Sequence, residues 1–129
     1  MSRIKLCIVG ACGRLGSTII KESIDNFEIV GAVESPNNSN IGKTLGNLGI
    51  IDSDVKIISS DDLSSAISNA DVTISATTPK SELLNAPVYV KNNKKIIIGT
   101  TGFSPDEYSK LLVILNNKVP SILTSNFSI

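Results

Sequence analysis

The 129 residues contain no histidine, and they contain only two cysteines. Without histidine, neither imidazole ligation of a metal nor a Ser–His–Asp triad can form within these residues. Cys7 and Cys12 match no zinc-binding spacing and are too few for a disulfide framework. We therefore expect two reduced thiols, no metal site and a cytoplasmic location.

An excess of charge of either sign is also missing, because 12 Lys and Arg balance 12 Asp and Glu. This balance argues against a nucleic-acid surface and against a polybasic membrane anchor. No apolar run approaches the roughly 20 residues of a membrane span. Arg3 and Lys5 interrupt the N-terminal apolar run, so we expect no signal peptide. The length and the 41% apolar content are typical of a single globular domain.

Apolar strand-like runs alternate along the chain with segments of helical spacing. The pattern predicts strands at 4–9, 28–34, 55–58, 71–76, 95–99 and 119–123, and helices at 14–25, 60–68, 79–92 and 105–115. A polar stretch at 35–47, rich in Asn, Ser and Gly, predicts a long loop. Such alternation favours an α/β fold of the Rossmann type, a doubly wound and mainly parallel sheet of about six strands with helices on both faces.

Two details of this pattern carry separate expectations. Pro87 falls inside the helix expected at 79–92, which predicts either a kink or two helical pieces. Three consecutive isoleucines at 96–98 predict a strand that is buried on both faces of the sheet.

The first strand runs directly into the sequence GACGRLG at residues 10–16, and a helix is expected to follow. A strand, a glycine-rich turn and a helix form the usual pyrophosphate site, because unpaired amides and the helix dipole stabilise an anion there. Arg14 is placed either to contact a phosphate or to lie solvated in the first turn. The alternative for the glycines is a tight turn that packs the helix on the sheet and binds nothing.

Glu34 ends the second expected strand. A carboxylate at this place accepts hydrogen bonds from the adenosine ribose and repels a 2′-phosphate, which favours NAD over NADP. An ordinary exposed glutamate is the alternative. Lys43 could still serve a 2′-phosphate if the loop folds back.

Further polar segments follow the other strands: Thr77–Pro79, Gly99–Phe103 and Thr124–Phe127. Because the carboxyl ends of parallel strands meet at one edge of a sheet, these segments should lie together near the point where strand order reverses. The turn at 99–103 could accept the carboxamide of a nicotinamide or the carboxylate of a substrate; a turn without a ligand is the alternative. Phe127, beside Asn126, is a candidate for lining a nicotinamide site.

Four motifs in order resemble the N-terminal half of the dihydrodipicolinate reductases: VGACGRLG at 9–16, AVE at 32–34, IGTTGF at 98–103 and SNFSI at 125–129. The resemblance implies a Rossmann domain that binds NADH or NADPH. It also implies an oxidoreductase of lysine (diaminopimelate) biosynthesis. That enzyme transfers a hydride to the dehydrated form of a dicarboxylate, hydroxy-tetrahydrodipicolinate.

The resemblance also assigns roles to individual positions, with Thr101 placed near a substrate carboxylate as well. The residues expected to bind the cofactor are Gly10, Ala11, Cys12, Gly13, Arg14, Leu15, Glu34, Thr77, Gly99, Thr100, Thr101, Thr124, Ser125, Asn126 and Phe127. Three positions depart from the family pattern. Cys12 replaces a smaller residue, Lys80 replaces an acidic one, and Ser35 replaces an arginine that helps to accept NADPH. The last of these departures favours NADH over NADPH.

In this family a substrate domain with a histidine and lysine acid–base motif follows the last matched segment. We therefore expect residues 1–129 to be the dinucleotide-binding domain without that C-terminal catalytic domain. Such a chain would contain no catalytic residue, bind cofactor and be nearly inactive. The resemblance implies a tetrameric parent that assembles through the missing domain. Two alternatives stay open: the cofactor domain of an aspartate or homoserine dehydrogenase, and a non-enzymatic NAD(H)-binding redox sensor.

Overall fold

Six parallel strands form a single sheet in the computed structural model, which describes residues 3–124. The strands are β1 (Ile4–Val9), β2 (Phe27–Glu34), β3 (Ile57–Ser59), β4 (Val72–Ser75), β5 (Lys95–Ile98) and β6 (Ser121–Leu123). The helices are α1 (Arg14–Ser23), η1 (Ser60–Asp62, a 3-10 turn), α2 (Leu63–Ile67), α3 (Pro79–Lys91) and α4 (Pro105–Leu115). The expected element types are confirmed, with ends that differ by a few residues.

The strand order is β3-β2-β1-β4-β5-β6, and every neighbouring pair is parallel. The chain first builds outward from β1 to β3 and then crosses back to β4, so the order reverses between β1 and β4. In a doubly wound sheet a ligand binds at the carboxyl ends of the strands on either side of this reversal. The expected α/β fold is therefore confirmed.

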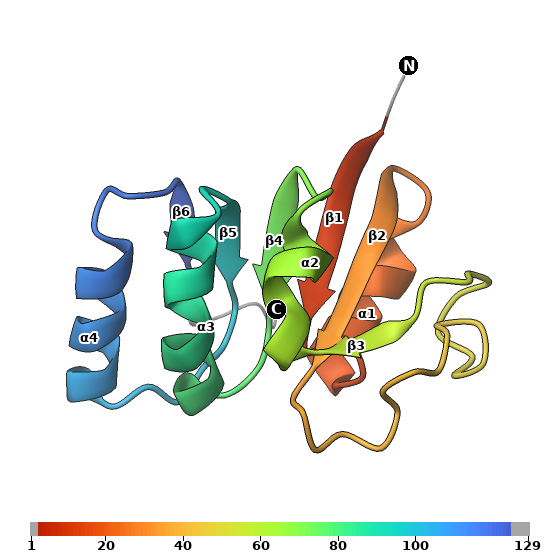
Figure 1. Ribbon diagram of the computed structural model, residues 1–129, viewed down its shortest axis with the longest axis horizontal. Coiled ribbons are helices and arrows are strands. Elements are labelled where there is room, and N and C mark those ends of the chain that lie inside the picture. The colour runs from red at the N-terminus through yellow and green to blue at the C-terminus, as the bar shows by residue number, and fades with distance from the viewer. Residues whose placement is uncertain (1–2, 125–129) are drawn as a thin grey trace.

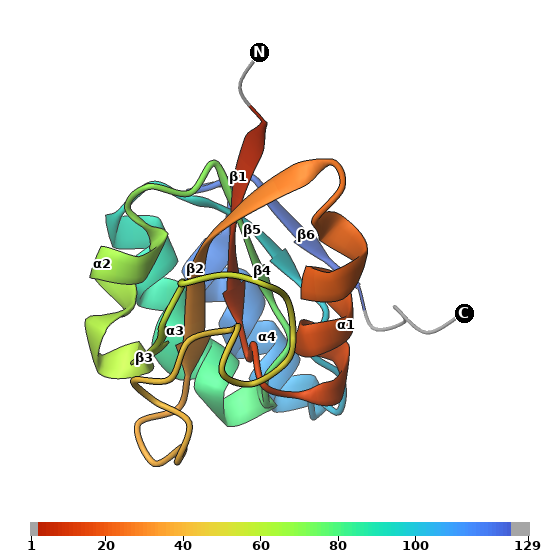
Figure 2. The same cartoon turned by 90° about the vertical axis from the view of Figure 1, so that its right-hand side faces the viewer.

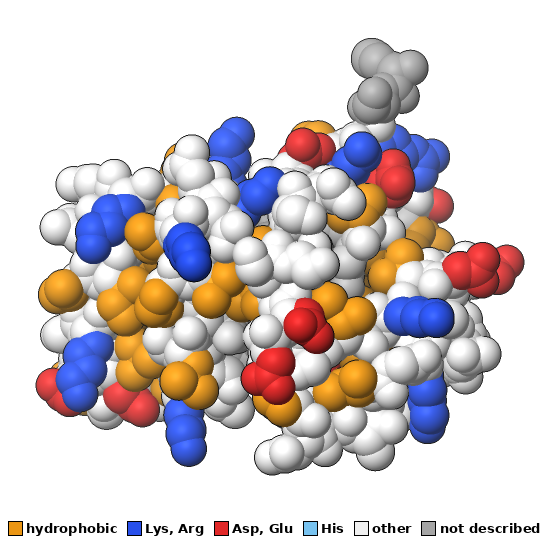
Figure 3. Space-filling view, in the orientation of Figure 1, with side chains coloured by type: hydrophobic (Ala, Val, Ile, Leu, Met, Phe, Trp, Pro, Cys, Tyr) orange, Lys and Arg blue, Asp and Glu red, His pale blue; other side chains and the backbone are white. Residues whose placement is uncertain are grey.

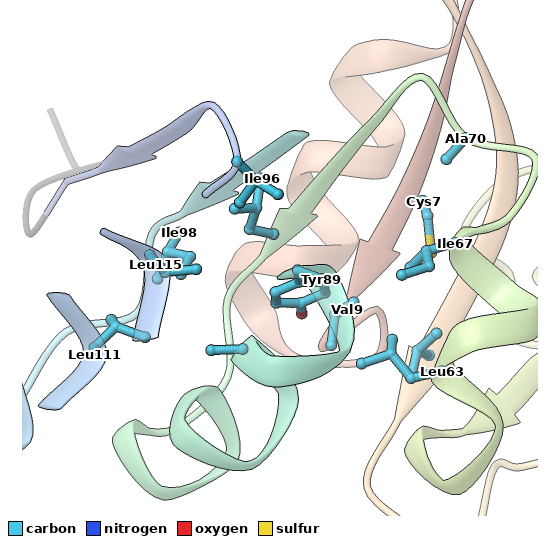
Figure 4. Close-up of a cluster of buried hydrophobic side chains, with 13 residues drawn as sticks. Cys7, Val9, Leu63, Ile67, Ala70, Tyr89, Ile96, Ile98, Leu111 and Leu115 are labelled. Carbon is cyan, nitrogen blue, oxygen red and sulfur yellow. The ribbon is translucent and has the colours of Figure 1, made fainter. Parts of the chain in front are cut away.

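Helices cover both faces of the sheet. Figures 1 and 2 show α2, α3 and α4 on one face and α1 on the other. The first face buries a cluster of side chains from β1, β5 and these three helices, with Tyr89 of α3 fully enclosed (Figure 4). On the second face, Ile8 of β1, Ile20 of α1 and their neighbours form a buried cluster between the sheet and α1.

Two helices begin with side-chain caps. The Thr78 hydroxyl accepts the amide of Ser81 at 3.2 Å, and Pro79 takes the first position of α3. Ser104 and Glu107 form a reciprocal capping box at α4, which fixes the turn that follows β5. Pro87 is exposed, and α3 runs past it as one helix, so the two-piece alternative is wrong.

The connection from β2 to β3 is longer than the loop expected at 35–47, since β3 begins only at Ile57. It has no helix, yet it buries Leu45 completely and packs several partly buried apolar side chains against the α1 face. This irregular segment therefore covers part of the sheet as a crossover helix would.

One expectation about burial is wrong. Ile96 and Ile98 are buried under α3 and α4, but Ile97 on the opposite face is only partly buried. Its neighbour on β6, Ile122, is 60% exposed. Neither α1 nor the 35–56 segment reaches far enough to cover β5 and β6 on that face.

Candidate functional site

A cavity of about 200 Å³ opens at the carboxyl ends of β1, β2 and β4, where the strand order reverses. Its walls come from the glycine-rich turn, the end of β2, the start of η1 and the first two turns of α3 with the connection before it. The lining residues are Val9, Gly10, Gly13, Glu34, Ser35, Ser60, Ala76, Thr77, Thr78, Ser81 and Asn85. Of the expected cofactor-binding residues, Gly10, Gly13, Glu34 and Thr77 meet here.

The three glycines of the turn differ in how much space the surrounding protein leaves for a side chain. Gly10 has φ +86°, and a Cβ there would overlap the carbonyl oxygen of Ala76. A Cβ at Gly16 would overlap the carbonyl oxygen of Gly10, so α1 could not approach β1 as closely. A Cβ at Gly13 would meet only that same oxygen, at 3.4 Å. Protein packing therefore requires Gly10 and Gly16, whereas Gly13 leaves space on the cavity side.

The amides of the turn are partly used by the protein itself. Those of Gly10 and Ala11 donate to the carbonyl of Val33 at 2.8 and 3.2 Å, and that of Gly13 donates to Gly10 at 3.1 Å. The Cys12 amide donates to Oε2 of Glu34 at 2.8 Å. Within residues 3–124, the first three amides of α1, from Arg14 to Gly16, make no hydrogen bond. These amides are available to donate hydrogen bonds to an anion, and the dipole of α1 favours a negative charge at the same place.

Glu34 is half-buried and reaches from the end of β2 to the glycine-rich turn. Ser35 lies beside it in the cavity wall. The 35–56 segment does fold back onto the molecule, but Lys43 is exposed and its Nζ donates to Oδ1 of Asn40 at 3.3 Å. Among the described residues, the cavity wall thus carries a carboxylate and no lysine or arginine. Arg14 is exposed in the first turn of α1.

The two cysteines differ in environment, and both are free thiols. Burial raises the pKa of Cys7 to about 12, as expected for a core residue in β1. Cys12 is half-buried in the turn; burial first, and then the charge of Glu34, raise its pKa. Neither thiol is activated as a nucleophile. No group of three or more potential metal-binding side chains lies within residues 3–124.

A second cavity of about 380 Å³ lies at the carboxyl ends of β5 and β6, against the start of α4. Thr100, Thr101 and Thr124 line it, together with Phe103 and Tyr108, whose rings meet edge to face at 6.0 Å. The Thr124 amide donates to Ile98 at 2.9 Å, and the Gly99 amide donates to Ser75 at 2.8 Å. Ser125, Asn126 and Phe127 lie outside the described residues.

Sequence reasoning missed a buried carboxylate between the two cavities. Glu82, in the first turn of α3, is 0% exposed, and its Oε2 accepts hydrogen bonds from the hydroxyls of Ser75, Thr77 and Thr100. Burial raises the pKa of Glu82. The signal was available, because Glu82 and Asn85 share a helical face with Ala86 and Tyr89, so polar residues occupy positions expected to be apolar.

Comparison with known proteins agrees with the motifs. A family model described as dihydrodipicolinate reductase, N-terminus, matches residues 4–127. The 4-hydroxy-tetrahydrodipicolinate reductase of Trichlorobacter lovleyi is 36% identical over 127 residues, which cover 98% of this chain and 47% of that protein. The reductase of the same name from Citrifermentans bemidjiense is also 36% identical, over 129 residues, with the same two coverages.

A solved structure of a dipicolinate-bound dihydrodipicolinate reductase from Paenisporosarcina sp. TG-14 superposes with a TM-score of 0.67. It is 22% identical and covers 97% of this chain and 48% of that one, so it supports the fold. The chain spans about half the length of the curated relatives that it matches. These comparisons do not favour a redox sensor or a dehydrogenase of the aspartate or homoserine type.

Proposed function

The chain belongs to the family of dihydrodipicolinate reductase N-terminal domains, and on that premise we propose that residues 1–129 form the part of such a reductase that binds a nicotinamide dinucleotide. The observation that carries the proposal is the cavity between β1 and β4. There the glycine-rich turn, the carboxylate of Glu34 and Thr77 converge from three separate segments.

The residues fit the cofactor on three structural grounds. The amides of Arg14, Leu15 and Gly16 are available to a diphosphate at the start of α1. Gly13 keeps the approach to the turn open. Glu34 lines the cavity at the end of β2, and a carboxylate at this position of the fold can accept hydrogen bonds from an adenosine ribose. We assign Gly10–Leu15 to the diphosphate, and Gly99–Thr101 with Thr124–Phe127 to the nicotinamide end, with Thr77 between them.

When bound, the reduced nicotinamide supplies a hydride. We propose that the acceptor is the dicarboxylate on which the family's reductases act in lysine biosynthesis, and that Thr101 lies near one of its carboxylates. Thr101 is exposed at the mouth of the second cavity, which suits contact with a ligand. Because these 129 residues contain no histidine for proton transfer, we expect them to bind cofactor and to turn over little.

We propose NADH as the favoured cofactor, because Glu34 and the neutral Ser35 line the cavity where a 2′-phosphate would need a cation. We also propose a cytoplasmic location, supported by the two free thiols. Tetrameric assembly of the full reductase through a second domain stays a prediction from the family resemblance.

Calorimetric titration of the 129-residue chain with NADH and with NADPH tests the proposal. We expect both to bind, with NADH binding at least as tightly. A clear preference for NADPH would refute the role of Glu34 while leaving the dinucleotide site in place. Absence of any heat or saturation with either nucleotide would refute the proposed function itself.

A further inference from the structure

Glu82 is the one fully enclosed acidic side chain among residues 3–124. It lies in the first turn of α3 and faces the carboxyl ends of β4 and β5. Enclosing a carboxylate is unfavourable unless hydrogen bonds replace its hydration. The structure provides such bonds on one oxygen only, because Oε1 of Glu82 has no partner within the described residues. A group held in this way needs a reason other than general stability of the core.

Glu82 accepts hydrogen bonds from three hydroxyl groups, which belong to different parts of the chain. Ser75 ends β4 and lies 2.8 Å from Oε2, and Thr77 follows in the β4–α3 connection at 2.9 Å. Thr100 comes from the segment after β5. The Thr100 hydroxyl also accepts the backbone amide of Thr77 at 2.7 Å, which closes the network. A single carboxyl group therefore joins the ends of two neighbouring strands.

The network lies between the two cavities. Thr77 lines the cavity at the glycine-rich turn, and its methyl group would lie 3.1 Å from a Cβ placed at Gly10. Thr100 lines the second cavity, beside Thr101. The hydrogen bonds around Glu82 thus link one residue of each cavity wall.

We propose that Glu82 is a positioning residue for the cofactor, holding Thr77 and Thr100 so that the diphosphate cavity and the nicotinamide segment form one continuous surface. This inference rests on the proposed function and adds to it a residue that touches no ligand. We expect a selective consequence, because Thr100 lines the second cavity, which is assigned to the nicotinamide, and Glu34 makes no hydrogen bond to the described residues of this network.

The test compares two ligands, NADH and ADP-ribose, which lacks the nicotinamide. Replacing Glu82 by leucine removes every acceptor. We expect it to weaken NADH binding about tenfold, because Thr77 and Thr100 lose the group that holds them, and to weaken ADP-ribose binding less than about threefold. Glu82→Gln keeps one acceptor oxygen and should stay within about threefold of the original NADH affinity. Glu22→Gln, an exposed change on α1, is the matched control.

If a thermal melt shows that Glu82→Leu does not fold, a second pair of variants tests the inference. Thr100→Val removes the bridging hydroxyl with little change of shape, and Thr100→Ser restores it. We expect the valine variant to show the same selective loss and the serine variant to recover. Unchanged NADH binding in the leucine and valine variants, or an equal loss of both ligands, would overturn the inference. If the unaltered chain binds neither ligand, the proposed function fails and this inference fails with it.

Discussion

The backbone amide of Cys12 donates a hydrogen bond to the carboxylate of Glu34 across 2.8 Å, joining residues 22 positions apart. The glycine-rich turn and the end of β2 are therefore tied together before any ligand arrives. The bond also places a negative charge in the cavity wall beside the turn, where it acts on whatever phosphate enters.

This charge predicts a change in cofactor selectivity. Replacing Glu34 by glutamine keeps an acceptor for the Cys12 amide and removes the charge that repels a 2′-phosphate. We expect the affinity for NADPH relative to NADH to rise about tenfold in calorimetric titrations. Glu28→Gln, at the exposed start of β2, should leave the ratio unchanged. An unaltered ratio in the Glu34 variant would show that this carboxylate does not face the ribose.

The three glycines of the turn predict a separation of binding from folding. Gly13→Val should abolish NADH binding but lower the free energy of unfolding by no more than about 1 kcal/mol, because no protein atom crowds that position. Gly16→Ala should cost about 1–3 kcal/mol of stability, since its Cβ would overlap the backbone of Gly10. Urea unfolding and calorimetry measure the two effects. Normal binding by Gly13→Val would make the turn purely structural.

The two thiols should react very differently. Cys7 is 0% exposed and its pKa is raised to about 12, whereas Cys12 is half-buried at the turn. A colorimetric thiol reagent should therefore label one cysteine in the native chain and both after denaturation. Saturating NADH should slow the native reaction, and Cys12→Ser should abolish it. Native labelling of the Cys12→Ser variant would mean that β1 is not enclosed as described.

The buried carboxyl group of Glu82 predicts a pH dependence of stability. Burial raises its pKa above the ordinary value of 4.5, so the folded chain holds this proton to higher pH than the unfolded chain does. The contribution of this group to stability is complete below pH 4.5 and is lost as the pH rises through the folded-state pKa. Urea unfolding over a pH series should therefore show the free energy of unfolding of Glu82→Gln rising relative to that of the original chain as the pH increases. The nearby Tyr89 hydroxyl stays neutral over that range, since burial and then the Glu82 charge raise its pKa. A pH-independent difference between the two chains would contradict the assignment.

Much of the fold could be predicted because its signals are local. Alternating apolar runs, proline at the first position of α3 and α4, and the capping box at Ser104 each depend on neighbours in sequence. The glycine-rich turn and Glu34 were identifiable for the same reason, since the turn directly follows β1 and Glu34 is the last residue of β2. The structure adds that they touch, which no spacing rule states.

The remainder depends on contacts between distant segments. The enclosure of Leu45 within an irregular connection follows from the space left beside α1, which the sequence of the connection does not encode. Glu82 was missed because a glutamate on a helix is usually solvated. Its enclosure is made tolerable by three hydroxyls, at the end of β4 and in the segments that follow β4 and β5. Ile97 was misjudged because burial of a strand on both faces requires a covering element on each side.

Because helices and loops cover the sheet unevenly, we expect its strands to unfold locally in a definite order. Strand β1 has a neighbour on each edge and a buried core on each face, whereas β6 pairs with β5 alone within residues 3–124 and leaves Ile122 60% exposed. Opening should therefore begin at β6 and reach β1 last. Hydrogen–deuterium exchange would show this as early uptake at Ser121–Leu123 and late uptake at Ile4–Val9. Equal protection of the two strands would mean that the sheet opens as one unit. On the proposed function, the expected gradient would place the turn assigned to the diphosphate on the slowest-exchanging strand and the segment assigned to the nicotinamide near the fastest.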